Sequence, residues 1–338
     1  MAKMDTLRIP FEQMQSEFKR ILLNHQFTED RANACTRIFA VNSLEGIYSH
    51  GVNRFERFIR HIQKGHIRVE KQPVLTNAVG ALEQWDGQLG PGPLNAQFST
   101  NQAMKIAGEY GLGAVALANT NHWMRGGTYG WQAAKEGFAF IGWTNTEANM
   151  PAWGAKDSRL GNNPLVFAVP FQDEAIVLDF AMSQYSYGKM ESKKLEGEQL
   201  PYPGGFNQKG ELSTDPSEIL ESGQALPIGY WKGAGLSLLL DILAAILSAG
   251  LPTHQISRRE DEYGVSQVFI AMDLKKLSNY PSIESTITDI IDDLKKSAED
   301  KPETRVRYPG EKVVATRNEN LKNGIPVNKA VWNNLLNL

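Results

Sequence analysis

The sequence predicts an α+β fold, in which N- and C-terminal helices form one domain around a second domain with a mixed, mainly antiparallel sheet. Apolar residues recur at helical spacing over the first seventy positions, strand-like runs fill the middle of the chain, and helical spacing returns near its end. We therefore expect a helical domain over residues 1–75, completed by about 282–338, and an α+β domain over 76–281.

The expected helices cover residues 11–27, 29–46 and 52–64 in the first part of the chain. In the third of these, Phe55, Phe58, Ile59 and Ile62 follow the i, i+3, i+4, i+7 pattern of one buried stripe, and Gly65 ends the helix. Further helices are expected at 94–109, 235–249 and 282–297, with a short terminal helix ending in Leu335 and Leu336.

The expected strands are runs rich in Val, Ile and Phe. They cover residues 114–120, 138–144, 165–171, 175–180 and 265–273. Between them, 201–210 and 213–223 carry Gly, Pro and Ser, which predict long loops.

Composition places the chain among ordinary globular proteins. Its 338 residues are 41% hydrophobic and 22% charged, and the formal net charge is −3. This balance predicts neither a nucleic-acid surface nor a polybasic membrane face.

The compartment is expected to be the cytoplasm. Met1–Gln15 lacks the apolar core and cleavage site of a secretory signal. The apolar run Leu236–Ala249 is interrupted by Asp241 and too short to span a bilayer, so it predicts a buried helix. The single cysteine, Cys35, lies in an expected helix and is interpreted as a buried thiol in a reducing compartment.

Two glycine-rich stretches bear on dinucleotide binding. Gly111–Ala116 matches a loose G-x-G-x-x-A pattern, but it follows a helix and precedes a strand, so it predicts only a helix C-cap. Lys232–Gly235 precedes an expected helix, where backbone N–H groups and a lysine could hold an anion. A tight turn into a buried helix explains the same residues, and both readings stay open. Any nicotinamide site would therefore not be an ordinary Rossmann unit.

His50 and Arg54 form the first candidate catalytic pair. They stand four residues apart at the entrance to the third helix, so both side chains could project from one side of its first turn. An imidazole can protonate a carbonyl oxygen, and a guanidinium can hold a carboxylate, as reduction of a 2-oxo acid requires. A capping histidine beside a solvated arginine is the alternative.

His122 is the second candidate. It follows an expected strand and precedes Trp123, Arg125 and Gly126, neighbours compatible with a substrate pocket. A loop histidine that binds backbone groups is an equally good explanation. The six histidines include no pair with zinc-site spacing, so no metal is expected. Ser49 beside His50 suggests a hydrolase only weakly, because the chain has no G-x-S-x-G elbow.

Taken together, several segments resemble the malate/L-lactate dehydrogenase-like oxidoreductases that lack a Rossmann fold. The matching segments are Tyr48–Arg54, Asn121–Gly127, Tyr129–Ala134, Met150–Lys156, Gly161–Pro164, Gly229–Gly233, Asp261–Gly264 and Pro309–Glu311. Within Gly161–Pro164 the chain has Asn162 where many relatives carry threonine.

The resemblance implies a homodimer with the active site near the subunit contact, and NAD(H) or NADP(H) as cofactor, of which we expect NAD(H). The resemblance also implies a small 2-oxo sugar acid as substrate, with His50 as the proton donor. Ser49 and Arg54 would orient His50 and the substrate, and His122 would lie across the pocket. Cofactor contacts are expected from Ile176, Val177, Leu178, Asp179, Phe180, Ala181, Trp231, Lys232, Pro309, Gly310 and Glu311. The alternatives are the same chemistry on malate, lactate, ureidoglycolate or a cyclic imine acid, a Ser49 hydrolase, and a silent NADH-binding protein.

Overall fold

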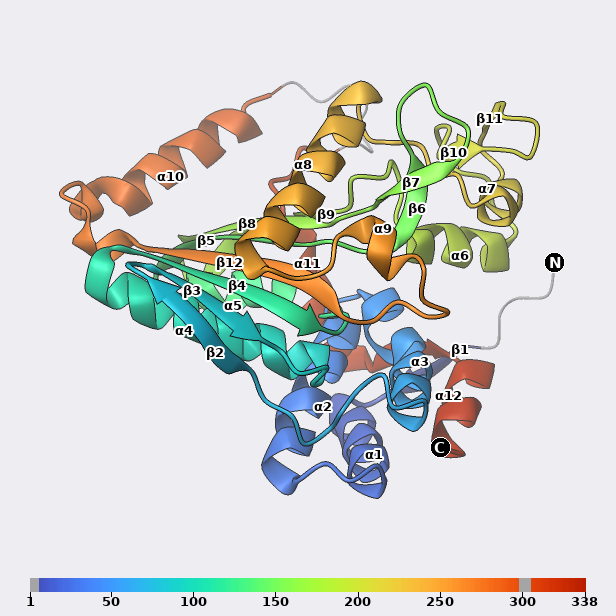
Figure 1. The fold of residues 1–338 in the computed structure, drawn as a ribbon, viewed down its shortest axis with the longest axis horizontal. Helices are drawn as coiled ribbons and strands as arrows, with labels where there is room; N and C mark the ends of the chain where they lie inside the picture. Colours follow the sequence, from blue (N-terminus) through green and yellow to red (C-terminus); the bar gives the residue numbers. More distant parts are fainter. Residues whose placement is uncertain (1–5, 298–304) are drawn as a thin grey trace.

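A seven-stranded sheet stands at the centre of the computed structural model, which describes residues 6–297 and 305–338 (Figure 1). The expectations for residues 1–5 and 298–304 lie outside this range. The strand order is β2 (Val74–Val79), β3 (Leu82–Asp86), β4 (Leu112–Thr120), β12 (Val265–Asp273), β5 (Phe138–Thr144), β8 (Leu165–Phe171) and β9 (Glu174–Phe180). Only β3 and β4 are parallel neighbours, which confirms the mixed, mainly antiparallel sheet.

Helices cover both faces of this sheet (Figure 1). On one face, α4 (Gly92–Tyr110) packs on β4 and β12, and α5 (Gly127–Lys135) packs on β8 and β9. Gly111 ends α4 with φ of 86°, which confirms the predicted C-cap. On the opposite face, α8 (Trp231–Ser248) contacts β4, β5 and β12.

The interpretation of α8 as a wholly buried helix is wrong. The helix begins at Trp231 rather than at 235, and its outer face exposes Leu236, Leu238, Leu239, Ile242, Leu243 and Ile246. By length and composition it could cross a membrane, but its inner face packs on the sheet. Gly233 lies within its first turn, where a Cβ atom would stand 2.3 Å from the carbonyl oxygen of Ile228. This glycine is therefore explained by close packing.

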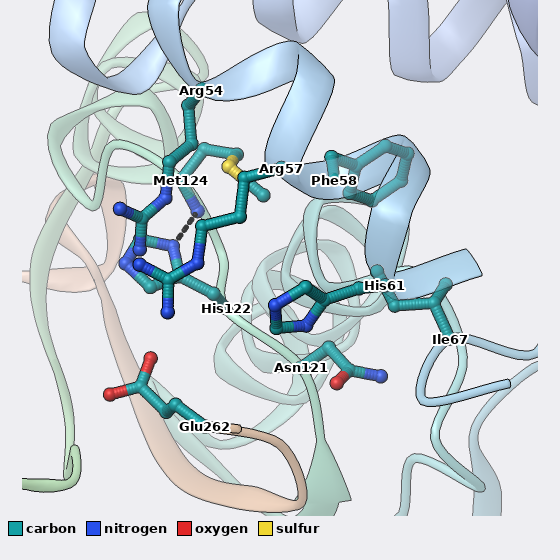
Figure 2. A pocket seen from close by; sticks show the side chains of 9 residues that line it. All are labelled: Arg54, Arg57, Phe58, His61, Ile67, Asn121, His122, Met124 and Glu262. Atoms are coloured by element: carbon teal, nitrogen blue, oxygen red, sulfur yellow. Dashed lines mark hydrogen bonds between the residues drawn. The ribbon is translucent and has the colours of Figure 1, made fainter. Parts of the chain in front are cut away.

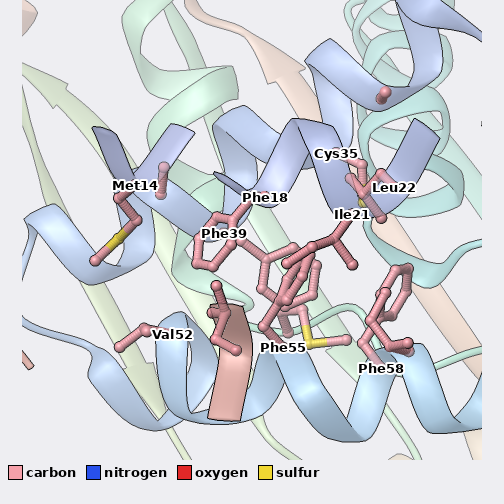
Figure 3. Close-up of a cluster of buried hydrophobic side chains, with 14 of the residues drawn as sticks. Met14, Phe18, Ile21, Leu22, Cys35, Phe39, Val52, Phe55 and Phe58 are labelled. Carbon is pink, nitrogen blue, oxygen red and sulfur yellow. The ribbon is translucent and has the colours of Figure 1, made fainter. Parts of the chain in front are cut away.

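The N-terminal helices form a layer of their own. It consists of α1 (Phe11–Asn24), α2 (Glu29–Leu44), α3 (Val52–Gln63) and α12 (Lys329–Leu336), with β1 (Thr6–Ile9) paired to β13 (Ile325–Asn328). Its core is aromatic (Figure 3): the rings of Phe18 and Phe55 stack at 4.2 Å, and Phe39 meets Phe55 edge-on at 5.0 Å. Cys35 is buried in the same core as a free thiol.

The remaining C-terminal helices divide between the two layers. α11 (Glu311–Asn323) contacts α2 and β13, whereas α10 (Tyr280–Lys295) contacts β8 and the short helix η2 (Leu274–Lys276). The expected domain boundaries remain a prediction, and we propose that the returning helical segment begins at α11 rather than near 282.

A small lobe extends beyond β9. It contains α6 (Tyr187–Glu196), β10 (Gly205–Phe206), β11 (Leu212–Ser213) and α7 (Pro216–Ser222), and beside it lie β6 (Ala148–Pro151), β7 (Ser158–Gly161) and α9 (Thr253–Ile256). The prediction of a loop over 213–223 is wrong there. Asp215 caps α7 by accepting the Ser217 N–H, Pro216 occupies its first position, and Gly223 ends it with φ of 66°.

Candidate active site

A cavity of about 670 Å³ lies between the helical layer, the end of β9 and the small lobe. Such a volume is in the range of small-molecule and cofactor sites. Ten of the predicted site residues line it: Ser49, His50, His122, Val177, Leu178, Asp179, Phe180, Ala181, Pro309 and Gly310. The structure therefore brings residues from four distant parts of the sequence to one cavity.

The other predicted site residues do not line this cavity. Arg54 lines a smaller cavity nearby. Glu311 forms ion pairs with Lys295 and Arg305 at 3.2 and 3.8 Å. Ile176 pairs with Val169 in the sheet.

Trp231 and Lys232 also lie outside the cavity. The Trp231 side chain is 66% exposed at the start of α8. The preceding segment pairs with the chain just beyond Ala181, since the Ile228 N–H donates to the Met182 carbonyl at 2.8 Å. These two residues are therefore next to one end of the cavity wall without facing the cavity.

Ser49 and His50 lie on the short helix η1 (Tyr48–His50). The Ser49 Oγ and the His50 Nδ1 are 2.9 Å apart, which leaves Nε2 as the ring nitrogen available to a ligand. Asn42 holds this helix in place: its Nδ2 donates to the His50 carbonyl, and its Oδ1 accepts from the Thr128 hydroxyl at the start of α5. Ser49 and His50 are thus held by contacts to both layers of the molecule.

His122 faces His50 and borders both cavities. The two imidazole rings are 5.7 Å apart between centroids and inclined by 26°. The Met124 N–H donates to the His122 Nδ1 at 3.0 Å, so the neutral ring carries its proton on Nε2. His122 is therefore placed as a hydrogen-bond donor rather than a second acid.

Both histidines are neutral at pH 7 in this arrangement. Burial, followed by the positive charges of Arg54 and Arg125, lowers the pKa of His50 to about 4. Burial, followed by the charge of Arg54, also holds the pKa of His122 well below its usual value. An anionic ligand beside Arg54 would offset the positive charge and raise the pKa of His50 toward neutrality.

The smaller cavity adjoins the larger one at His122 (Figure 2). Besides Arg54, its charged and titratable wall consists of Arg57 and His61 from α3 and Glu262 from the loop before β12. The sequence predicted no site role for Arg57, His61 or Glu262. Arg57 and His61 stand three and seven residues after Arg54 on one helical face, a spacing that could have identified them.

Two glycines allow segments of the larger cavity wall to pack closely on one another. The Val177 N–H donates to the Pro309 carbonyl at 3.2 Å, and Gly310, with φ of 92°, would place a Cβ atom 3.3 Å from the Val177 nitrogen. On the opposite wall, a Cβ atom on Gly188 would stand 2.6 Å from the Cβ of Ser49. Both glycines thus bring two segments of the cavity wall into close contact, where a side chain would not fit without displacing its neighbour.

Asn162 and Asn163, in the turn before β8, make different contacts. Asn162 lines the larger cavity, and its Oδ1 accepts from the Thr146 hydroxyl at 3.1 Å. Asn163 is fully buried and joins the Thr146 N–H to Ser237 of α8. The asparagine in place of threonine therefore keeps a polar side chain at the cavity wall.

A buried ionic network adjoins the larger cavity at Arg125. Glu45 of the α2 end binds Arg125 and Arg317, and Arg317 also binds Glu174 at 2.7 Å. Arg125 lines the larger cavity. Within residues 6–297 and 305–338, no group of three or more His, Cys, Asp or Glu side chains could hold a metal ion.

Comparison with known proteins gives one consistent result. The malate/L-lactate dehydrogenase family model matches residues 9–336. A 2,3-diketo-L-gulonate reductase of Pasteurella multocida is 43% identical over 333 residues, which cover 98% of this chain and 100% of the relative. A protein of the same description from Escherichia coli O139:H28 is 42% identical, with 96% and 98% covered. The crystal structure of malate dehydrogenase from Entamoeba histolytica superposes with a TM-score of 0.93 at 23% identity, covering 99% of each chain, which shows the shared fold.

Proposed function

Because the chain belongs to the malate/L-lactate dehydrogenase family, whose members are oxidoreductases, we propose that it reduces the C2 keto group of 2,3-diketo-L-gulonate to 3-dehydro-L-gulonate with NADH. The observation that carries this proposal is the pairing of His50 with Ser49 on the wall of a cavity large enough for a dinucleotide. The full-length similarity to reductases of this name supports the choice of substrate.

The residues of the chain have separate tasks in this reaction. Residues of β9 and the turn at Pro309 would hold NADH, which would supply the hydride that C2 accepts. His50 donates the proton from Nε2 to the C2 oxygen, and Ser49 holds its Nδ1 so that the ring keeps one orientation. His122 donates from its own Nε2 toward the same oxygen, and Arg54 binds the carboxylate. The proton that His50 gives up returns from solvent.

The proposal is tested by the loss of NADH absorbance when 2,3-diketo-L-gulonate is added to the purified protein. NADPH, pyruvate, malate, lactate, ureidoglycolate and a cyclic imine acid are run alongside in the matching direction. Oxidation of NADH fastest with the diketo acid supports substrate and cofactor together. Turnover with only one of the other acids would identify that acid as the substrate. Turnover with only NADPH would show that the cofactor is NADPH and not NADH.

Arg54→Lys should raise KM for the substrate about tenfold or more and change kcat less. A lysine keeps the charge but cannot form the planar two-bond fork with a carboxylate, and one charge-assisted hydrogen bond is worth roughly 1.5–3 kcal/mol. Steady-state kinetics measure the split. Arg60→Lys, at an exposed position of the same helix, is the matched control. An unchanged KM would place the carboxylate elsewhere.

We also propose that a second copy of the chain covers the apolar face of α8. Six leucine and isoleucine side chains are exposed there although the helix packs on the sheet, a pattern typical of subunit contacts. Trp231 and Lys232 stand at the start of this helix, so pairing of two copies would give them a route to the partner's cofactor.

The double variant Leu239→Arg/Ile246→Arg should convert a dimer into a monomer, as measured by light scattering after gel filtration. Two charges on a face of this size would have to be buried without partners in the dimer. Leu195→Arg/Tyr202→Arg, at exposed positions of the small lobe, is the control. A monomeric wild-type protein would contradict the prediction, and unchanged NADH affinity in the monomeric variant would remove Trp231 and Lys232 from the site.

A further inference from the structure

The smaller cavity contains charges of both signs that are not paired with one another. Arg54 and Arg57 project into it from α3, and their guanidinium groups lie above the Glu262 carboxylate (Figure 2). Among the described residues, neither guanidinium forms a hydrogen bond or an ion pair within 4.0 Å. Because the guanidiniums and the carboxylate are not paired with one another, both remain available to bind a polar ligand.

Glu262 presents one carboxylate oxygen to this cavity. Its side chain is 8% exposed, and its Oε2 accepts the Glu147 N–H at 3.1 Å. The Oε1 atom accepts no hydrogen bond from the described part of the chain. This oxygen can therefore accept a hydrogen bond from a ligand.

Asn121 offers a second acceptor on the same wall. Its Nδ2 donates to three backbone carbonyls at 3.0–3.1 Å, which fixes the orientation of the amide. Its Oδ1 is buried and has no hydrogen-bond partner. A buried acceptor without a donor is costly, so this atom points to a ligand that brings an O–H or N–H group.

We propose that Arg57 and Glu262 form the subsite for the substrate chain beyond the keto group, and that Glu262 selects a neutral, hydroxyl-bearing chain over a second carboxylate. This inference rests on the proposed reduction of a 2-oxo sugar acid. Arg57 donates to oxygen atoms of the chain, while Glu262 and Asn121 accept from its hydroxyls. A carboxylate in the same place would face Glu262 at close range and be repelled, whereas a methyl group would leave all three side chains without partners.

The size of the cavity limits what enters it. Its volume is about 20 Å³, room for about one water-sized group. A single hydroxyl group of the chain therefore enters the subsite, and the rest of the substrate, with the carboxylate that Arg54 binds, remains beside His122.

The test compares kcat/KM for NADH-dependent reduction of 2,3-diketo-L-gulonate, oxaloacetate and pyruvate. In Glu262→Gln, the preference for the diketo acid over oxaloacetate should fall about tenfold or more, because the amide no longer repels a carboxylate. In Arg57→Gln, the preference for the diketo acid over pyruvate should fall by a similar factor, since pyruvate has no chain to reach the subsite. Glu260→Gln and Arg60→Gln, at exposed positions of the same loop and helix, should leave both ratios unchanged.

The possible results distinguish failure of the proposed subsite from failure of the proposed reaction. Unchanged ratios in both variants of an enzyme that prefers the diketo acid would overturn the subsite alone. A wild-type enzyme that reduces oxaloacetate or pyruvate faster than the diketo acid would overturn the proposed function, and the subsite with it. If Glu262→Gln fails to fold, the ratio measured with Arg57→Gln still decides, because Arg57 is only half-buried.

Discussion

Replacement of His50 by alanine should lower kcat about 10³-fold while NADH binds nearly as tightly as before. General acid catalysis by a positioned imidazole contributes about 10²–10⁴ to a rate, and the His50 ring lines the larger cavity 5.7 Å from the ring of His122. Its removal leaves β9 and the turn at Pro309 unchanged. Single-turnover kinetics measure the loss, and quenching of tryptophan fluorescence measures NADH binding.

The pH dependence of kcat/KM should identify His50 as the group that donates the proton. Only the imidazolium form of His50 can donate, and its pKa is lowered to about 4. Between pH 5 and 8, kcat/KM for reduction should therefore fall about tenfold per pH unit as pH rises, because the protonated fraction of the free enzyme falls by that factor. The slope should disappear in His50→Ala. A wild-type profile that is flat in this range would remove His50 as the acid.

Ser49→Ala is the matched variant for the serine. Its hydroxyl orients the His50 ring and takes no part in bond making, so we expect a loss of about tenfold in kcat. A hydrolase that used Ser49 as nucleophile would lose all activity in this variant and would need no nicotinamide. The two mechanisms thus give different results with one protein.

The fold was largely predictable because its strongest signals are local. The stripe of Phe55, Phe58 and Ile59 fixed the buried face of α3, and Gly111 fixed the end of α4. The order of strands was not predictable in the same way. β12 lies between β4 and β5 although at least 120 residues separate it from either along the chain, and no local pattern encodes such a pairing.

The site was predictable where its residues share a motif and unpredictable where they come from different layers. Ser49 and His50 are neighbours in sequence, so their hydrogen bond follows from one short helix. Glu262 reaches the same region from a loop more than two hundred residues later, and only the tertiary fold brings it to the same cavity as Arg57. The exposed face of α8 was not predicted for a related reason. Apolar composition alone does not distinguish a helix that is buried within its own chain from one whose outer face is exposed.

Disruption of the ionic network beneath the site should strongly destabilise the contact between the two layers. Glu45 is 6% exposed and binds two guanidiniums, with its Oε2 on Arg125 and its Oε1 on Arg317 at 2.7 Å. Arg317 also lies over the Trp131 ring at 5.3 Å. The carboxylate thus joins α2 to α11 and to the segment that carries His122.

Replacement of Glu45 by alanine should lower the free energy of unfolding by about 3–5 kcal/mol, because it leaves a buried guanidinium at Arg125 without its partner. The shift of the denaturant midpoint measures this loss. Glu319→Ala, which removes a 61% exposed carboxylate 3.9 Å from Arg8, is the control and should cost at most about 1 kcal/mol. Glu45→Gln should fall between the two, since an amide oxygen can still accept from one guanidinium.

The same substitution should weaken the active site before it unfolds the protein. Arg125 lines the larger cavity and follows Met124, whose N–H holds the Nδ1 of His122. Once Glu45 no longer fixes Arg125, this segment can shift, and misplacement of a catalytic group by about 1 Å costs roughly 10²-fold in rate. We therefore expect kcat of Glu45→Ala to fall well below the value of Glu319→Ala at temperatures where both proteins are folded. Equal kcat values would mean that the network stabilises the contact between layers without positioning His122.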